Sequence, residues 1–168
     1  MRRPRSTERV TDESGDMARF RLTTHVDAPV EDVFRYVTGY GPDGSLDEAI
    51  VQEKYGEILE REDGAILVRE DVRRYPEDDP ELITWRCSFE YASARTMEAL
   101  DSAWADRHDS FEAEGAGTRW TVRWNTRIGG LRGLVQYVVF RLRAHRWTRR
   151  DLLDPVKDHF EGVDSPPL

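Results

Sequence analysis

The hydrophobic pattern of this 168-residue chain changes its period at Gly129-Gly130. Before these glycines, short segments alternate apolar and polar residues, which is the pattern of half-buried β-strands. After them, apolar residues recur every three or four positions, which indicates an amphipathic helix. Because a chain of this length usually forms one core, the change of period predicts a single domain of antiparallel strands followed by one long helix.

The alternating segments are separated by short turns, as in an antiparallel sheet. EDG (62–64) and GAG (115–117) are the clearest of these turns, since glycine permits a tight reversal of the chain. The predicted strands are 19–26, 53–61, 65–73, 82–91, 94–101, 103–113 and 118–128.

A short helix is predicted directly after the first strand. Pro29 suits the first helical position, where its missing N–H costs nothing, and Gly39 is a plausible stop. LDEAI (46–50) indicates one further helical turn. The apolar face of the short helix consists of Val30, Val33, Phe34 and Val37.

The C-terminal apolar pattern predicts a helix of about 30 residues, which would be about 45 Å long. His145 and Arg149 interrupt its apolar face, and Pro155 must kink or restart it. The least costly arrangement makes Asp154 a new N-cap and Pro155 the first residue of a second helix. The apolar positions are Leu131, Val135, Val138, Leu142, Leu152, Val156 and Phe160.

Residues 1–16 have almost no apolar content and are predicted to form a disordered tail. The folded domain is expected at 17–162, followed by a short tail at 163–168. Met17 stands directly before the first strand, so both Met1 and Met17 are candidates for the biological start.

Composition excludes several classes of protein. The net charge is −8, which disfavours nucleic acid as a partner. The single cysteine, Cys87, excludes an intrachain disulfide and suits a reducing compartment, so a cytoplasmic location is expected. No apolar run is long enough to span a membrane. The four histidines show no metal-ligand spacing, and neither a metal nor a cofactor is predicted.

The segment 129–150 contains six arginines and no acidic residue. Residues 131–150 could lie on an anionic membrane surface, because VQYVVF within them is apolar. The favoured alternative is that their apolar side packs on the sheet while their arginines pair with an acidic rim.

Three motifs occur in a characteristic order. A strand leads into DAPVEDVF (27–34), GAGTRWTVRW (115–124) follows, and DLLDPVKDHFEG (151–162) closes the chain. Together, over about residues 18–162, they resemble the START-like or polyketide cyclase/dehydrase superfamily (SRPBCC). The resemblance implies an α+β helix-grip fold, in which a curved antiparallel sheet wraps around a long C-terminal helix. It also implies two short helices after the first strand and a hydrophobic cavity between sheet and helix.

The resemblance favours a protein that binds or carries a small hydrophobic or amphipathic molecule in that cavity. Arg149 would recognise a ligand carboxylate and His145 would assist it, although both could instead be solvated, or Arg149 could pair with a sheet carboxylate such as Glu70. Glu70 itself is either a polar group of the cavity or a solvated strand end. The predicted ligand-binding residues are Trp85, Phe89, Trp120, Trp124, Val138, Leu142, His145 and Arg149.

Two other functions stay open. The first is a cyclase or dehydratase, with Asp106 and His108, or His145, as acid and base. Its weak point is the phase of strand 103–113, because the opposite phase, with Arg107 and Asp109 inward, is as apolar as the first. The second is a protein-interaction module like the chaperone-activating branch of the superfamily. The residues favour binding over catalysis, and no catalytic residue is assigned.

Overall fold

The structure is a computed structural model, and it describes residues 17–72, 81–100, 106–127, 138, 145, 146 and 148–162. The predicted tails at 1–16 and 163–168 lie outside these residues, as does most of the helix predicted after Gly129-Gly130. Within the described ranges, none of the helices has both the length and the apolar character that a bilayer-spanning segment requires.

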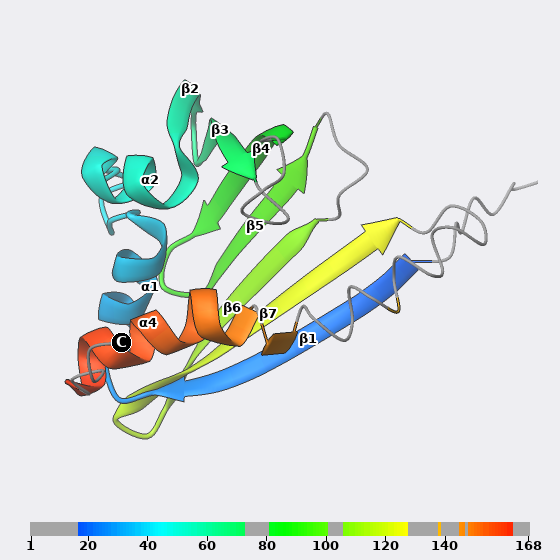
Figure 1. Cartoon of the computed structure of the whole chain (residues 1–168). Helices are drawn as coiled ribbons and strands as arrows, with labels where there is room; N and C mark the ends of the chain where they lie inside the picture. Colours follow the sequence, from blue (N-terminus) through cyan, green and yellow to red (C-terminus); the bar gives the residue numbers. More distant parts are fainter. Residues whose placement is uncertain are drawn as a thin grey trace, which may run out of the picture.

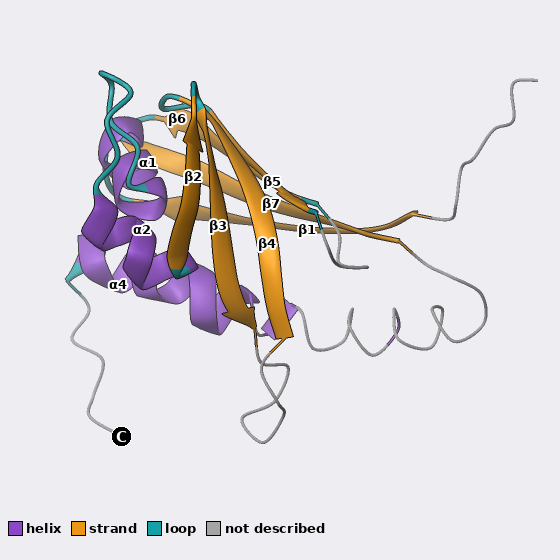
Figure 2. Cartoon of the chain, turned by 90° about the horizontal axis from the view of Figure 1, so that it is seen from above, coloured by secondary structure: helices purple, strands orange, loops and turns teal. Residues whose placement is uncertain are grey.

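In the described part of the chain, seven antiparallel strands form one sheet in the order β1-β7-β6-β5-β4-β3-β2. Each strand from β2 to β7 pairs with its neighbours in sequence, whereas β1 pairs with β7. The sheet is curved, and α1, α2 and α4 gather at one end on its concave side (Figures 1 and 2). The α+β helix-grip fold is thus confirmed. The strands are β1 (Met17–Val26), β2 (Glu57–Glu62), β3 (Ala65–Val72), β4 (Glu81–Glu90), β5 (Ala94–Ala99), β6 (Arg107–Glu114) and β7 (Gly117–Arg127).

The chain leaves the sheet at Ala28-Pro29 and enters α1 (Val30–Thr38). Pro29 precedes the helix and is not its first residue, so the prediction was wrong by one position. With φ −56° and ψ 147°, Pro29 is still extended, and its carbonyl oxygen accepts the N–H of Val33 at 3.1 Å. Gly39 ends α1 in the left-handed conformation, as predicted, with φ 71°.

The second helix is longer than predicted. α2 spans Glu48–Tyr55, so the strand predicted at 53–61 begins only at Glu57. The side chain of Asp47 caps α2 by accepting the N–H of Ile50 at 3.3 Å. Tyr55 belongs to the helix because its ring is buried and its hydroxyl donates to the carbonyl oxygen of Val37 at 2.8 Å.

The C-terminal helix continues through Pro155 without a new cap. Arg149–Leu153 (η1) form a π-helical turn in which the N–H of Asp154 donates to the carbonyl oxygen of Arg149. α4 (Asp154–Glu161) follows directly, and Leu153 and Asp154 both have helical dihedral angles. The predicted capping role of Asp154 is therefore wrong. The wider π turn accommodates Pro155, which has no N–H to donate.

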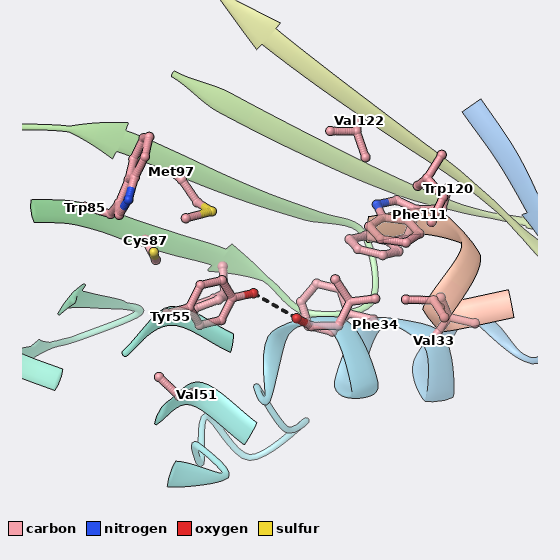
Figure 3. Close-up of a cluster of buried hydrophobic side chains, with 14 of the residues drawn as sticks. Val33, Phe34, Val51, Tyr55, Trp85, Cys87, Met97, Phe111, Trp120 and Val122 are labelled. Atoms are coloured by element: carbon pink, nitrogen blue, oxygen red, sulfur yellow. Dashed lines mark hydrogen bonds between the residues drawn. The ribbon is translucent and has the colours of Figure 1, made fainter. Parts of the chain in front are cut away.

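The core lies between the concave face of the sheet and the helices (Figure 3). Phe34 of α1 packs edge-to-face on Phe111 of β6, with ring centroids 5.2 Å apart. Phe111 in turn stacks on Trp120 of β7 at 5.8 Å. These aromatic contacts fix α1 over the sheet end at which β6 turns into β7.

The turn between β6 and β7 also fixes the bend between β1 and α1. The buried hydroxyl of Thr118 donates to the carbonyl oxygen of Ala28 at 2.7 Å. Gly117 is required beside it, because a Cβ there would lie 2.6 Å from Nε2 of His25 and 2.7 Å from the carbonyl oxygen of Val26. The glycine-threonine pair thus allows the two segments to approach closely.

This contact can be tested by Thr118→Val, which keeps the shape and strand propensity of the side chain but removes its hydroxyl. The carbonyl of Ala28 would lose its partner in the interior, so the free energy of unfolding in urea should fall by about 1–3 kcal/mol. Thr24→Val, which removes a hydroxyl with only a 3.5 Å contact to the next residue's carbonyl, is the control and should cost less than about 0.5 kcal/mol. Equal losses would contradict the anchoring role of Thr118.

Candidate functional site

The concave face carries large aromatic side chains that the strand register brings together. Trp85 of β4 and Trp124 of β7 make an edge-to-face contact, with ring centroids 6.5 Å apart. They meet across β5 and β6: Trp124 is in register with Arg107, Met97 and Cys87, and Trp85 lies two residues before Cys87 on β4. Phe89, another residue predicted to bind the ligand, stacks on Tyr40 with ring centroids 4.7 Å apart. We refer to Trp85, Phe89, Trp120 and Trp124 as the aromatic wall.

The helix residues predicted to face the aromatic wall are less buried. Val138 is 50% exposed, and Leu142 lies outside the described residues. His145 is exposed but contacts the ring of Phe20 edge-to-face at 6.3 Å. The Arg149 side chain is 67% exposed and pairs with Asp154 at 3.8 Å. The structure therefore puts His145 and Arg149 at the surface and places neither of them within the core.

The phase of β6, which the sequence left open, is decided by burial. Arg107, Asp109 and Phe111 are buried on the concave side. His108 therefore points to the outer face, where its Nδ1 lies 3.1 Å from the hydroxyl of Thr96. Asp106 lies just before the strand, in the same phase as His108. Asp106 and His108 could act as an acid/base pair inside the fold only if β6 had the opposite phase.

Two arginines share one carboxylate in the interior. Nε and Nη2 of Arg95 donate to Oδ2 of Asp109 at 3.0 and 2.7 Å. Oδ1 accepts Nη2 of Arg107 at 2.9 Å and the indole N–H of Trp120 at 3.0 Å. The side chains of Arg95, Asp109 and Arg107 are 1%, 0% and 7% exposed. We call Arg95, Arg107 and Asp109 the buried charge cluster.

Charge pairing overcomes burial at Asp109. Burial alone would raise the pKa of this carboxyl group, but Arg107 and then Arg95 lower it below its ordinary value. Burial also lowers the pKa of Arg95 to about 10, although Asp109 opposes that change. The Arg95 guanidinium gains one further acceptor, the carbonyl oxygen of Val37 at the end of α1, at 3.4 Å. Arg95 and Asp109 are therefore a charged pair at neutral pH.

Arg107 is incompletely paired. Its Nε is buried and has no hydrogen-bond partner among the residues that the structure describes. Its guanidinium carbon lies 5.3 Å from the centroid of the Trp124 ring, a cation–π contact that supplies no acceptor. The buried charge cluster holds two cations and one anion, so it carries a surplus positive charge next to the aromatic wall.

Two acidic side chains near the aromatic wall, Glu70 and Cys87, have pKa values above their ordinary ones. Burial raises the pKa of Glu70 above its ordinary value, although Trp85 and Arg107 oppose the rise. The Trp85 indole N–H lies close enough to Glu70 to affect its pKa but makes no hydrogen bond of normal geometry. Burial raises the pKa of the Cys87 thiol to about 12, so it is neutral and unreactive at physiological pH.

An open groove of about 720 Å³ runs along the surface between α2 and β2. Its lining includes no residue of the aromatic wall or of the buried charge cluster. The groove is lined by Glu48, Gln52, Gly56, Glu57, Ile58, Leu59, Glu60 and Arg61. We therefore place the candidate site on the concave face and not in this groove. In the described part of the chain, no three His, Cys, Asp or Glu side chains are grouped so that they could hold a metal ion.

Sequence reasoning identified the aromatic wall but missed the buried charge cluster. The available signal was the R-x-D-x-F pattern of 107–111, which places two charges in phase with a large aromatic residue. Arg95 occupies the same kind of position on the neighbouring strand, directly opposite Asp109 in register. An arginine and an aspartate at directly opposed positions indicate a buried ion pair as readily as an exposed one.

The variant Asp109→Asn should be strongly destabilised, because it leaves two guanidinium groups in the interior with no anion. Losing one partner of a buried ion pair costs about 3–5 kcal/mol, measured as the free energy of unfolding in urea. The matched control is Asp27→Asn, which removes a largely exposed carboxylate 3.0 Å from His25 and should change stability little. Similar small losses in both variants would contradict the central role of Asp109.

The raised pKa of Glu70 predicts a pH-dependent effect of Glu70→Gln. Below its ordinary pKa of 4.5, Glu70 is protonated in both the folded and unfolded states. As pH rises through its raised folded-state pKa, the wild type loses stability that the neutral glutamine keeps. The variant should therefore match the wild type near pH 4 and exceed it near pH 8, in urea unfolding at both pH values. The control is Glu98→Gln on the exposed side of β5; the same change with pH in both variants would contradict a specific effect of Glu70.

Comparison with solved structures shows that this arrangement of sheet and helices is shared at low sequence identity. The di-domain ARO/CYC BexL from the BE-7585A biosynthetic pathway matches with a TM-score of 0.63 at 19% identity, over 90% of this chain and 51% of BexL. The di-domain ARO/CYC StfQ from the steffimycin biosynthetic pathway has a TM-score of 0.65 at 14% identity, over 87% of this chain and 51% of StfQ. TTHA0849 from Thermus thermophilus has a TM-score of 0.59 at 16% identity, over 88% of this chain and 100% of TTHA0849.

The chain thus spans about half the length of the two di-domain proteins. No protein-family model and no curated protein matches its sequence. At identities this low, structural similarity establishes the fold alone. The chain has the helix-grip fold of the ARO/CYC di-domain proteins and of TTHA0849.

Proposed function

We propose that this chain binds a small hydrophobic or amphipathic molecule between the concave face of its sheet and its C-terminal helix, and that it does so without covalent chemistry. The observation that carries this proposal is the contact between the rings of Trp85 and Trp124, whose centroids lie 6.5 Å apart. The partly paired guanidinium of Arg107 lies over the Trp124 ring. Ligand sites are commonly formed by aromatic surfaces with a few polar groups among them.

The aromatic wall supplies a flat apolar surface of the kind that such a ligand requires. Trp85 and Trp124 would contact the ligand directly, and Phe89, held by its stacking on Tyr40, would close one end. Trp120 is fully buried and donates a hydrogen bond to Asp109, so it would support the other aromatic residues of the wall without contacting the ligand. Val138 and Leu142 would contribute the helix side, with His145 and Arg149 at the rim.

The fold neighbours support this proposal by analogy. BexL and StfQ are di-domain ARO/CYC proteins from biosynthetic pathways, and this chain shares their fold. One fold serves many functions, however, so the likeness names no ligand for this chain.

We also place the activity in the cytoplasm, since the buried single thiol of Cys87 suits a reducing compartment.

A second candidate is an enzyme of the cyclase or dehydratase type. The observation that favours it is Glu70, a carboxyl group whose pKa is raised, chiefly by burial. A carboxyl group with a raised pKa keeps its proton to a higher pH than an ordinary glutamate does, which suits a general acid. Glu70 would then replace Asp106 and His108, which the phase of β6 turns away from the interior.

The binding proposal can be tested by titrating the full chain with phenylnaphthylamine, an uncharged apolar probe that fluoresces when it leaves water. The wild type should bind the probe saturably, and Trp124→Leu should weaken binding by about tenfold, since it removes much of one aromatic surface. Leu100→Ala, which truncates a residue 52% exposed just beyond β5, is the control and should bind as the wild type does. Absence of saturable binding to the wild type would overturn the proposal.

A further inference from the structure

The inference concerns the chemical class of the ligand and rests on the proposed function. The ionised carboxylate of Asp109 can accept about four hydrogen bonds, two at each oxygen. Both sites of Oδ2 are taken by Nε and Nη2 of Arg95. Both sites of Oδ1 are taken by Arg107 and Trp120. Asp109 therefore has no capacity left for the remaining N–H groups of Arg107.

Arg107 consequently has donors that Asp109 cannot satisfy. Its Nε is buried and without an acceptor within the described ranges. A buried donor left unpaired costs about 1–3 kcal/mol, and more when it belongs to a charged group. Native structures keep such groups rarely, so each one calls for a specific explanation.

A second donor lies in the same region. Nε1 of Trp85 is also buried and makes no hydrogen bond in the described part of the structure. The Trp124 ring contacts both residues, since it lies 6.5 Å from the Trp85 ring and 5.3 Å from the Arg107 guanidinium carbon. Trp85, Cys87 and Met97 lie together on this face of the sheet (Figure 3). Two unsatisfied N–H groups thus flank one aromatic surface.

The protein's own acids do not complete the site. Glu70 lies close enough to Trp85 and Arg107 for both to lower its pKa, yet among the described residues it makes no hydrogen bond of normal geometry with Trp85 and no ion pair with Arg107. The Cys87 thiol is neutral, and Asp109 is fully used. What is missing is an acceptor that carries negative charge and enters beside the aromatic wall.

We propose that Nε of Arg107 and Nε1 of Trp85 bind an anionic oxygen of the ligand, so that the ligand is an amphipathic anion. Its apolar body lies on Trp85 and Trp124, and its carboxylate or other deprotonated acid group reaches the buried charge cluster. One negative charge there balances the surplus of the two arginines over Asp109. The anionic head is thus recognised in the interior, and not at the rim where Arg149 lies.

The test compares two fluorescent probes that differ in one group. Anilinonaphthalene sulfonate is phenylnaphthylamine with an added sulfonate, so the pair isolates the contribution of an anion on the same apolar body. The full-length wild type should bind the anionic probe at least about tenfold more tightly than the neutral one, because charge-assisted hydrogen bonds to a buried cation are strong.

Two variants then locate that preference. Arg107→Met removes the unsatisfied cation and leaves Asp109 paired with Arg95, so the buried charges still balance. Trp85→Phe removes the indole donor and keeps a smaller aromatic ring. Each variant should lower the ratio of anionic-probe to neutral-probe affinity by about tenfold, because any change in the apolar contact affects both probes and cancels in that ratio. Arg86→Met on the outer face of β4, 48% exposed and paired with Glu62, is the control for loss of a positive charge.

The possible results separate the two proposals. If the neutral probe binds but the anionic probe shows no preference, or if its preference survives in both Trp85→Phe and Arg107→Met, the anionic-ligand inference is overturned and the binding function stands. An equal loss of the anionic probe in Arg86→Met would also overturn it, because general surface charge would then explain the preference. Failure of both probes to bind the wild type overturns the binding function itself.

Discussion

The buried carboxylate of Asp109 is the interaction on which the rest of the structure depends. It joins three adjacent strands, because its partners Arg95, Arg107 and Trp120 come from β5, β6 and β7. Arg95 extends the connection to α1 through the carbonyl oxygen of Val37, which also accepts the Tyr55 hydroxyl of α2. One anion thereby orients the middle of the sheet together with α1 and α2. A hydrophobic cluster of the same volume could be as stable but would not fix these positions through directed bonds.

Most of the fold follows from periodicity, and the exceptions have physical reasons. Most strands were predictable because one face is buried and the other is not, as in β4 and β5. The second helix was underestimated because the apolar residues of 48–55 do not gather on one face; capping by Asp47 and the burial of Val51 and Tyr55 define it. At Pro155, sequence rules offered a restart, whereas the chain uses a π turn, which no local motif announces.

The candidate site was predictable only in its apolar part. Trp85 and Trp124 could be found because aromatic residues in phase along strands must share a face. Arg107 and Asp109 could not be assigned, since the two phases of β6 are equally apolar and only the three-dimensional partner Arg95 makes burial of these charges tolerable. The polar residues chosen from the sequence, His145 and Arg149, lie on a helix whose exposure depends on how far it overhangs the sheet. The exposure of these two residues depends on tertiary packing, so the helical repeat of the sequence does not predict it.

The pairing of β1 with β7 determines the order in which the molecule can assemble. Thr23 and Thr121 join the two strands across 98 residues of sequence, whereas β2 to β7 pair with near neighbours. During synthesis β1 leaves the ribosome first, yet its partner β7 is the last strand of the sheet to be made. Closing such a long loop is entropically unfavourable and slow, so the meander from β2 to β7 should form first and serve as the template for β1. Until then the apolar side of β1 has nothing to cover it, and a nascent chain stalled before β7 would be a substrate for chaperones.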